Sequence, residues 1–194
     1  ASRIVGFAAL VGLLMVMLFI KVPAAGERGS YINRVPLILV LTSAPILVWS
    51  LGGLEGTLFS LLVTIGCFQL VAADYSANNR QYAAAGVILG LSFLTRPDSI
   101  VFISVSIFWL FWLKWKSKSH SYVRIISYCA GVLIVVIPYV LWQVLYYGDV
   151  LPNTFYAKVG TPLWLRAYLG LRYIVNYSIR PPFLPILVCI SLVY

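Results

Sequence analysis

The chain has 194 residues, of which 62% are hydrophobic and only 10% are charged, with a net charge of +9. Soluble globular domains carry about 25% charged residues, so this composition excludes a soluble domain and indicates an integral membrane protein. The positive charge does not indicate nucleic-acid binding, because the basic residues are dispersed between apolar runs and do not gather on one face.

Uncharged runs long enough to cross a membrane follow one another along the chain. A spanning helix needs roughly 20 apolar residues, with about 17–25 the usual range. The fourth run is short, which favours a tilted helix or one that its neighbours shelter from lipid. We therefore expect an all-α bundle of about six or seven spans that forms one transmembrane domain over residues 1–194. The expected spans are 3–21, 35–51, 54–73, 82–95, 98–113, 124–146 and an incomplete one from 182.

The charges of the connecting segments predict the orientation. The segment 114–124 (KWKSKSHSYVR) holds four basic residues and no acidic one, and an excess of lysine and arginine marks cytoplasmic loops. Because the spans alternate in direction, the connections 74–81 and 21–34 are also expected on the cytoplasmic side. The connections expected on the extracytoplasmic side are the turns 50–55 and 95–98 and the long segment 147–181. This long segment is too polar and broken to span the membrane, so it is predicted to be re-entrant or interfacial.

Three of the five acidic residues, Glu55, Asp98 and Asp149, fall in these extracytoplasmic connections. An ionisable residue at the centre of the bilayer costs roughly 3 kcal/mol and tends to face a cavity or a partner. Glu55 lies between glycines at the start of a span, where the helix dipole alone also favours a carboxylate. Asp98 falls in the first turn of the helix that Pro97 begins, with the same alternative. Both carboxylates are therefore open to a functional or a purely structural interpretation.

Several basic residues on this side are candidates for binding an anion. The guanidinium of Arg96 has fixed donors that suit bidentate contact with a phosphate. In the segment YYGDVLPNTFYAK, Asn153 can cap a short helix that carries Lys158, which favours an anion site. The alternative is an interfacial helix with a lysine that reaches the headgroups. Arg172 and Arg180 alternate with aromatic residues, a pattern typical of a helix at the membrane surface or of arginines that reach a lipid-linked phosphate.

The motif LTRPD at 94–98 and the segment at 146–158 together resemble the signature of a group of bacterial polytopic glycosyltransferases. This group belongs to the GT-C superfamily and is related to membrane arabinofuranosyl- and mannosyltransferases. A Gly-Leu-Glu run that ends at Glu55 resembles a further element of the group, in the same order along the chain. The resemblance implies a GT-C-like bundle in the bacterial cytoplasmic (inner) membrane, with its active face on the extracytoplasmic side.

The resemblance also implies the reaction, in which a sugar moves from a polyprenyl-phosphate donor to a glycan or lipid acceptor of the cell envelope. The departing phosphate needs positive charge, which Arg96 and Lys158 are expected to supply. Asparagine and carboxylate side chains would orient the loop, contact the sugar or hold the arginines. The expected substrate-binding residues are Arg96, Asp149, Asn153, Lys158, Arg172 and Arg180.

The catalytic base is not expected among these residues. In enzymes of this group the catalytic carboxylate usually follows the first membrane helix, whereas the first acidic residue here is Glu27, in a connection predicted to be cytoplasmic. The chain starts with alanine and stops within an apolar run. We therefore expect a fragment that lacks the N-terminal catalytic loop and is inactive alone, with Glu55 and Asp98 as the fallback bases.

The residues alone leave two other classes of function open. A transporter or lipid flippase would explain charged groups at one face equally well, and a non-catalytic scaffold would tolerate the loss of Arg96 and Lys158. No metal site is expected from the cysteines or the single histidine, and no cofactor beyond the lipid-linked donor. A divalent metal as an aid to transfer stays open.

Overall fold

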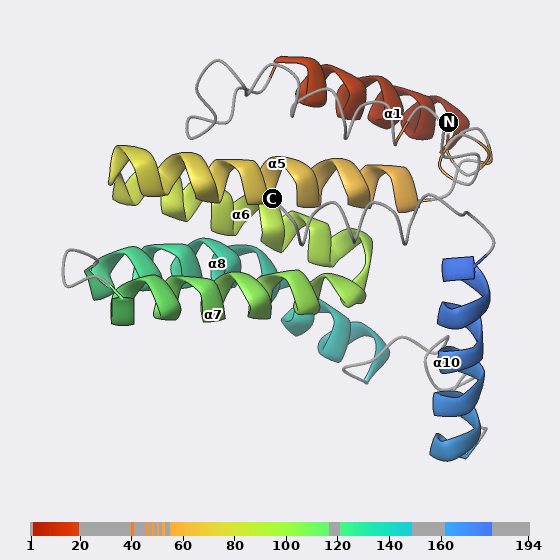
Figure 1. Cartoon of the computed structure of the whole chain (residues 1–194). Coiled ribbons are helices and arrows are strands. Elements are labelled where there is room, and N and C mark those ends of the chain that lie inside the picture. Colours follow the sequence, from red (N-terminus) through yellow and green to blue (C-terminus); the bar gives the residue numbers. More distant parts are fainter. Residues whose placement is uncertain are drawn as a thin grey trace. The chain divides into compact units, whose positions relative to one another are not determined.

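The structure is a computed structural model, and it describes residues 2–19, 40, 46, 48, 50, 52, 55–116, 121–148 and 162–179. All regular secondary structure in these ranges is helical. The chain divides into two compact units, Ala1–Leu145 and Tyr146–Tyr194. The first unit contains α1 (Ser2–Phe19), α5 (Gly56–Ser76), α6 (Asn79–Thr95), the short 3₁₀ helix η2 (Pro97–Ser99), α7 (Ile100–Lys116) and most of α8 (Tyr122–Tyr147), as Figure 1 shows.

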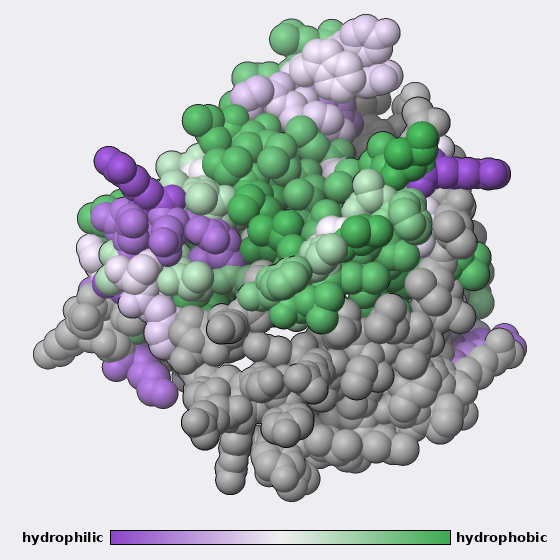
Figure 2. Space-filling view, turned by 90° about the horizontal axis from the view of Figure 1, so that it is seen from above, coloured by the Kyte–Doolittle hydropathy of each residue, from purple (hydrophilic) through white to green (hydrophobic). Residues whose placement is uncertain are grey.

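Four stretches of helix are long and apolar enough to cross a membrane. They are α1, α5, α8 and the stretch Pro97–Lys116, which joins η2 and α7. In Figure 2 the coloured surface is mostly hydrophobic, and its strongly hydrophilic side chains lie toward the left and right margins. The described part of the chain is thus that of a helical membrane protein, as its composition predicts.

Short polar turns reverse the chain between the helices of the first unit. α5 ends where Ala77 adopts a left-handed conformation with φ 54°, and the Asn78 side chain then accepts a hydrogen bond of 3.0 Å from the backbone N–H of Arg80. This capping starts α6 in the opposite direction. α6 ends at Thr95, and the next residue, Arg96, is extended with φ −148° because a proline follows it. Consecutive helices therefore run antiparallel, and the start of α5 lies at the same end as the turn between α6 and α7.

The largest core cluster lies among α5, α6, α7 and α8. α6 is enclosed by the other three helices, and Tyr82, Ala85 and Leu89 on it are fully buried. This agrees with the expectation that the short fourth segment is sheltered by its neighbours. A smaller cluster joins α1 to α5, where Leu10 and Leu13 pack with Leu61.

Helices α6 and α8 approach so closely that glycine is required at their contact. A Cβ atom built on Gly86 would collide with the carbonyl oxygen of Tyr128, and one built on Gly131 would collide with the carbonyl oxygen of Ala83. The same Cβ on Gly131 would also lie 3.0 Å from the backbone nitrogen of Val87. Small residues of this kind let membrane helices pack backbone to backbone.

The described part of the second unit contains α10 (Leu163–Ile179). Three of its aromatic side chains, Trp164, Tyr168 and Tyr173, are exposed, and so is Arg172. A helix with interleaved aromatic and basic residues is therefore present in the segment where the sequence predicts one.

Candidate functional site

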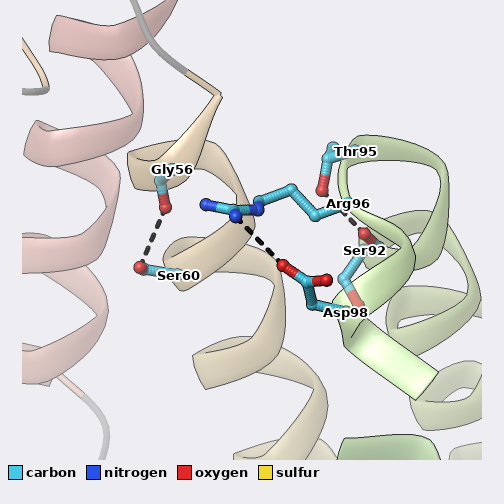
Figure 3. A network of polar contacts seen from close by, with 6 residues as sticks. All are labelled: Gly56, Ser60, Ser92, Thr95, Arg96 and Asp98. Atoms are coloured by element: carbon cyan, nitrogen blue, oxygen red, sulfur yellow. Dashed lines mark hydrogen bonds and ion pairs between the residues drawn. The ribbon is translucent and has the colours of Figure 1, made fainter. Parts of the chain in front are cut away.

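One end of the first unit brings together the start of α5 and the turn between α6 and α7. The guanidinium of Arg96 reaches from this turn across the first turn of α5, where its central carbon lies 5.8 Å from the centre of the Phe59 ring. Figure 3 shows the Arg96 side chain extended toward α5 beside Ser60. The Phe59 ring also makes an edge contact with Phe102 of α7, with 5.9 Å between ring centres. Arg96 thus lies at the margin of an aromatic surface at the end of the helices.

Arg96 forms an ion pair with Asp98 within the same turn. One Nη2–Oδ2 contact of 3.0 Å joins them, and their side chains are 39% and 69% exposed, respectively. An ion pair this exposed contributes little to stability, typically about 0–1 kcal/mol. The guanidinium has five N–H donors, and this contact uses one nitrogen. The rest of the group is therefore able to contact an anion without unfolding the turn.

Buried hydroxyl groups fix the backbone that carries Arg96 (Figure 3). The Ser92 hydroxyl donates to the Leu89 carbonyl at 2.7 Å and lies 2.7 Å from the Ser99 hydroxyl, which can therefore donate to it. The Ser92 carbonyl in turn accepts from the Thr95 hydroxyl at 2.7 Å and from the backbone N–H of Arg96 at 3.0 Å. Ser92 and Ser99 are fully buried. In the sequence, only the hydroxyl residues Ser92 and Ser99 on either side of the motif 94–98 indicate such a network.

Glu55 lies at the same end of the unit as Arg96. Its carbonyl accepts a 2.9 Å hydrogen bond from the backbone N–H of Phe59. Glu55 therefore lies one helical turn before Phe59, the residue whose ring the Arg96 guanidinium approaches. Its side chain is exposed, and it does not cap α5 by a hydrogen bond. Glu55 occupies the N-cap position of α5, so its charge lies at the helix N-terminus, where the dipole favours a carboxylate. Both the structural and the functional interpretation of this carboxylate therefore stay open.

The predicted site residues fall into three groups. Glu55, Arg96 and Asp98 lie at one end of the first unit, as the alternating direction of the spans predicts. Arg172 is an exposed residue of α10 in the second unit. The residues that lie outside the described ranges are Asp149, Asn153, Lys158 and Arg180.

A second polar cluster, which the sequence did not reveal, joins α5, α6 and α8 at the opposite end. The hydroxyl of the fully buried Tyr82 donates to Oδ1 of Asp74 at 2.9 Å. Nη1 of Arg124 lies 3.9 Å from the same oxygen, and its guanidinium carbon lies 5.9 Å from the centre of the Tyr82 ring. The partly buried charges of Asp74 and Arg124 compensate each other, so we interpret the trio as a clamp between helices.

Two buried tyrosines give a test of this clamp. Tyr82→Phe is expected to lower the free energy of unfolding by about 1–3 kcal/mol, because it removes a hydrogen bond to a carboxylate. Tyr128 is equally buried, but its hydroxyl has no hydrogen-bond partner among the described residues, and the nearby Ser106 does not meet bonding geometry. Tyr128→Phe is therefore expected to be neutral or stabilising. Thermal unfolding in detergent micelles measures both, and equal losses would contradict the assignment.

Within the described ranges, no group of three histidine, cysteine, aspartate or glutamate side chains could hold a metal ion.

The chain was compared with known protein families, characterised proteins and solved structures. No protein-family model matches the chain, and neither characterised proteins nor solved structures gave a match.

Proposed function

We propose that this protein is a membrane glycosyltransferase that moves a sugar from a polyprenyl-phosphate donor to a cell-envelope acceptor. The observation that carries the proposal is the position of Arg96, a half-exposed cation beside Phe59 at the end of apolar helices. A lipid-linked phosphate has matching parts, with an anionic group at headgroup depth and a long apolar tail. The motif resemblance supports the same substrate, and the reaction takes place at the extracytoplasmic face of the bacterial inner membrane.

In this reaction the acceptor hydroxyl oxygen attacks the anomeric carbon as the bond from that carbon to the phosphate oxygen breaks. The hydroxyl proton passes to a general base, and negative charge develops on the departing polyprenyl phosphate. Arg96 stabilises this charge with the donors that Asp98 does not use. The buried Ser92 and Ser99 hydroxyls hold the turn, so the guanidinium is in place before the phosphate arrives.

The remaining residues that the sequence predicts are proposed to act on the same substrate. Lys158, Arg172 and Arg180 are proposed to contact the phosphate, while Asp149 and Asn153 contact the sugar or position these cations. If no residue outside residues 1–194 accepts the proton, Glu55 and Asp98 are the carboxylates that we propose as the general base.

The proposal is tested with the full-length protein in lipid nanodiscs. Radiolabelled polyprenyl-phosphate sugars are supplied with cell-envelope acceptors, and the labelled product is separated from the donor. Transfer from at least one donor is the expected result. No transfer from any donor, together with substrate-dependent flux in sealed vesicles, would show instead that the protein is a transporter or lipid flippase.

A further inference from the structure

A groove opens between the end of α7 and the start of α8, at the end opposite Arg96. It has a volume of about 550 Å³, and a neighbouring pocket of about 300 Å³ shares two of its tryptophans. The described residues that line the groove are aromatic except for one lysine. They are Phe108, Phe111, Trp112, Lys114, Trp115 and Tyr122.

A cation is held at the margin of this α7–α8 groove. Nζ of Lys114 lies 4.9 Å from the centre of the Tyr122 ring, a geometry in which the ring face attracts an ammonium group. Lys116 lines the neighbouring pocket. Among the described residues neither lysine forms an ion pair, and the sequence from 114 to 124 contains no acidic residue. The positive charge at this margin is therefore not balanced by the part of the chain that the structure describes.

The aromatic surface below the lysines is largely accessible. Phe108 is 70% exposed and Trp115 is 85% exposed, so the described helices leave both rings uncovered. Tryptophan and tyrosine at the ends of membrane helices occupy the headgroup region, whereas phenylalanine further along the helix faces acyl chains. The groove thus passes from a cationic margin at headgroup depth to an apolar surface deeper in the membrane.

We propose that the α7–α8 groove binds one anionic glycerophospholipid from the leaflet at this end. The phosphate contacts Lys114 and Lys116, and an acyl chain lies along Phe108 and Trp112. Charge complementarity selects this occupant, because an anionic headgroup supplies the counter-charge that both lysines lack. The volume is within the range of about 300–1,000 Å³ that is usual for small-molecule sites. This site is separate from the proposed glycosyltransferase site and does not depend on it.

The test measures lipid retained by the full-length protein, using native mass spectrometry after purification from mixed micelles of phosphatidylglycerol and phosphatidylcholine. The wild-type protein is expected to retain one phosphatidylglycerol in preference to phosphatidylcholine. The double variant Lys114→Gln/Lys116→Gln is expected to bind phosphatidylglycerol on the order of 30-fold more weakly, because each lysine near an anionic lipid contributes roughly one kcal/mol and about 1.4 kcal/mol corresponds to a factor of ten. Trp115→Ala, at an exposed position, is expected to weaken retention of both lipids without any change in charge.

Arg80→Gln is the matched control, because Arg80 is an exposed cation at the same end of the unit but outside the groove. It is expected to leave the retained lipid unchanged. Equal loss of phosphatidylglycerol in the Arg80 variant and in the double lysine variant would mean that only the overall charge of this end attracts lipid, and the site would be wrong. Equal retention of the two lipids by the wild-type protein would also overturn the proposal.

Discussion

Arg96→Ala is expected to lower the rate of sugar transfer by about 100-fold or more, the loss that follows removal of one preorganised group that stabilises developing charge. The helices should remain folded, since the Arg96–Asp98 pair is largely exposed and contributes about 0–1 kcal/mol. Arg96→Lys is expected to recover only part of the rate, because an ammonium cannot replace a planar, bidentate donor. The initial rate with a polyprenyl-phosphate sugar is the measurement.

Arg80→Ala serves as the control for this variant. It removes an equally cationic but exposed side chain on the same helix, at the opposite end from the proposed site, and the transfer rate should not change. Asp98→Asn adds a second comparison. It frees the guanidinium from its counter-ion but keeps Arg96. If another residue is the general base, this variant should reduce transfer far less than the loss of Arg96, whereas an equal loss would indicate that Asp98 is the base. If Arg96→Ala retained full activity, the protein would still be a glycosyltransferase, but Arg96 would not contact the phosphate.

The positions of most described helices could be predicted from apolar runs, but their ends could not. The apolar run predicts a span over 54–73 that ends before the charged Asp74, whereas α5 continues to Ser76. The sequence predicts that the next span starts at Tyr82, whereas α6 starts at Asn79. The reason is that Asp74 is compensated by Tyr82 and Arg124, so the helices extend into residues that hydropathy alone treats as a loop.

The number of spans stays a prediction. The sequence predicts six complete spans, and within the described residues four stretches reach the length and hydropathy needed to cross a membrane. α6 has 17 residues, which is at the lower end of the usual range of about 17–25 for a span, and it belongs to the enclosed core. Within the segment 35–51 the structure describes only residues 40, 46, 48 and 50, and the run from 182 lies outside the described ranges.

The candidate site was predictable where it follows from chain direction. Antiparallel spans must place Glu55 and the Arg96–Asp98 turn at one end, and Pro97 alone is enough to end one helix there and begin the next. Contacts between different helices were not predictable in this way. The position of Arg96 over Phe59, and the bond between the Ser92 and Ser99 hydroxyls, depend on how each helix is rotated about its axis. A single sequence does not specify that rotation when apolar residues occur on all faces.

Gly86→Ala is expected to destabilise the first unit strongly. A Cβ there meets the carbonyl oxygen of Tyr128 and lies 3.0 Å from the backbone nitrogen of Val132. Backbone atoms cannot rotate away as a side chain can, so α6 and α8 must separate. Overpacking of a core costs about 1–3 kcal/mol, and it should exceed the roughly 1 kcal/mol that alanine gains over glycine in a helix. Gly131→Ala, from the facing helix, should have the same sign and a similar size.

Gly170→Ala separates the packing effect from helix propensity. Gly170 is also within a helix, but a Cβ built on it meets no described atom within 4 Å. The same substitution should therefore be neutral or raise stability by up to about 1 kcal/mol, with the gain coming from reduced flexibility of the unfolded chain. Denaturant unfolding of the full-length protein in micelles compares the three variants directly. A Gly86 variant as stable as the Gly170 variant would mean that α6 and α8 do not pack backbone to backbone, and that the enclosed core of the unit is arranged differently.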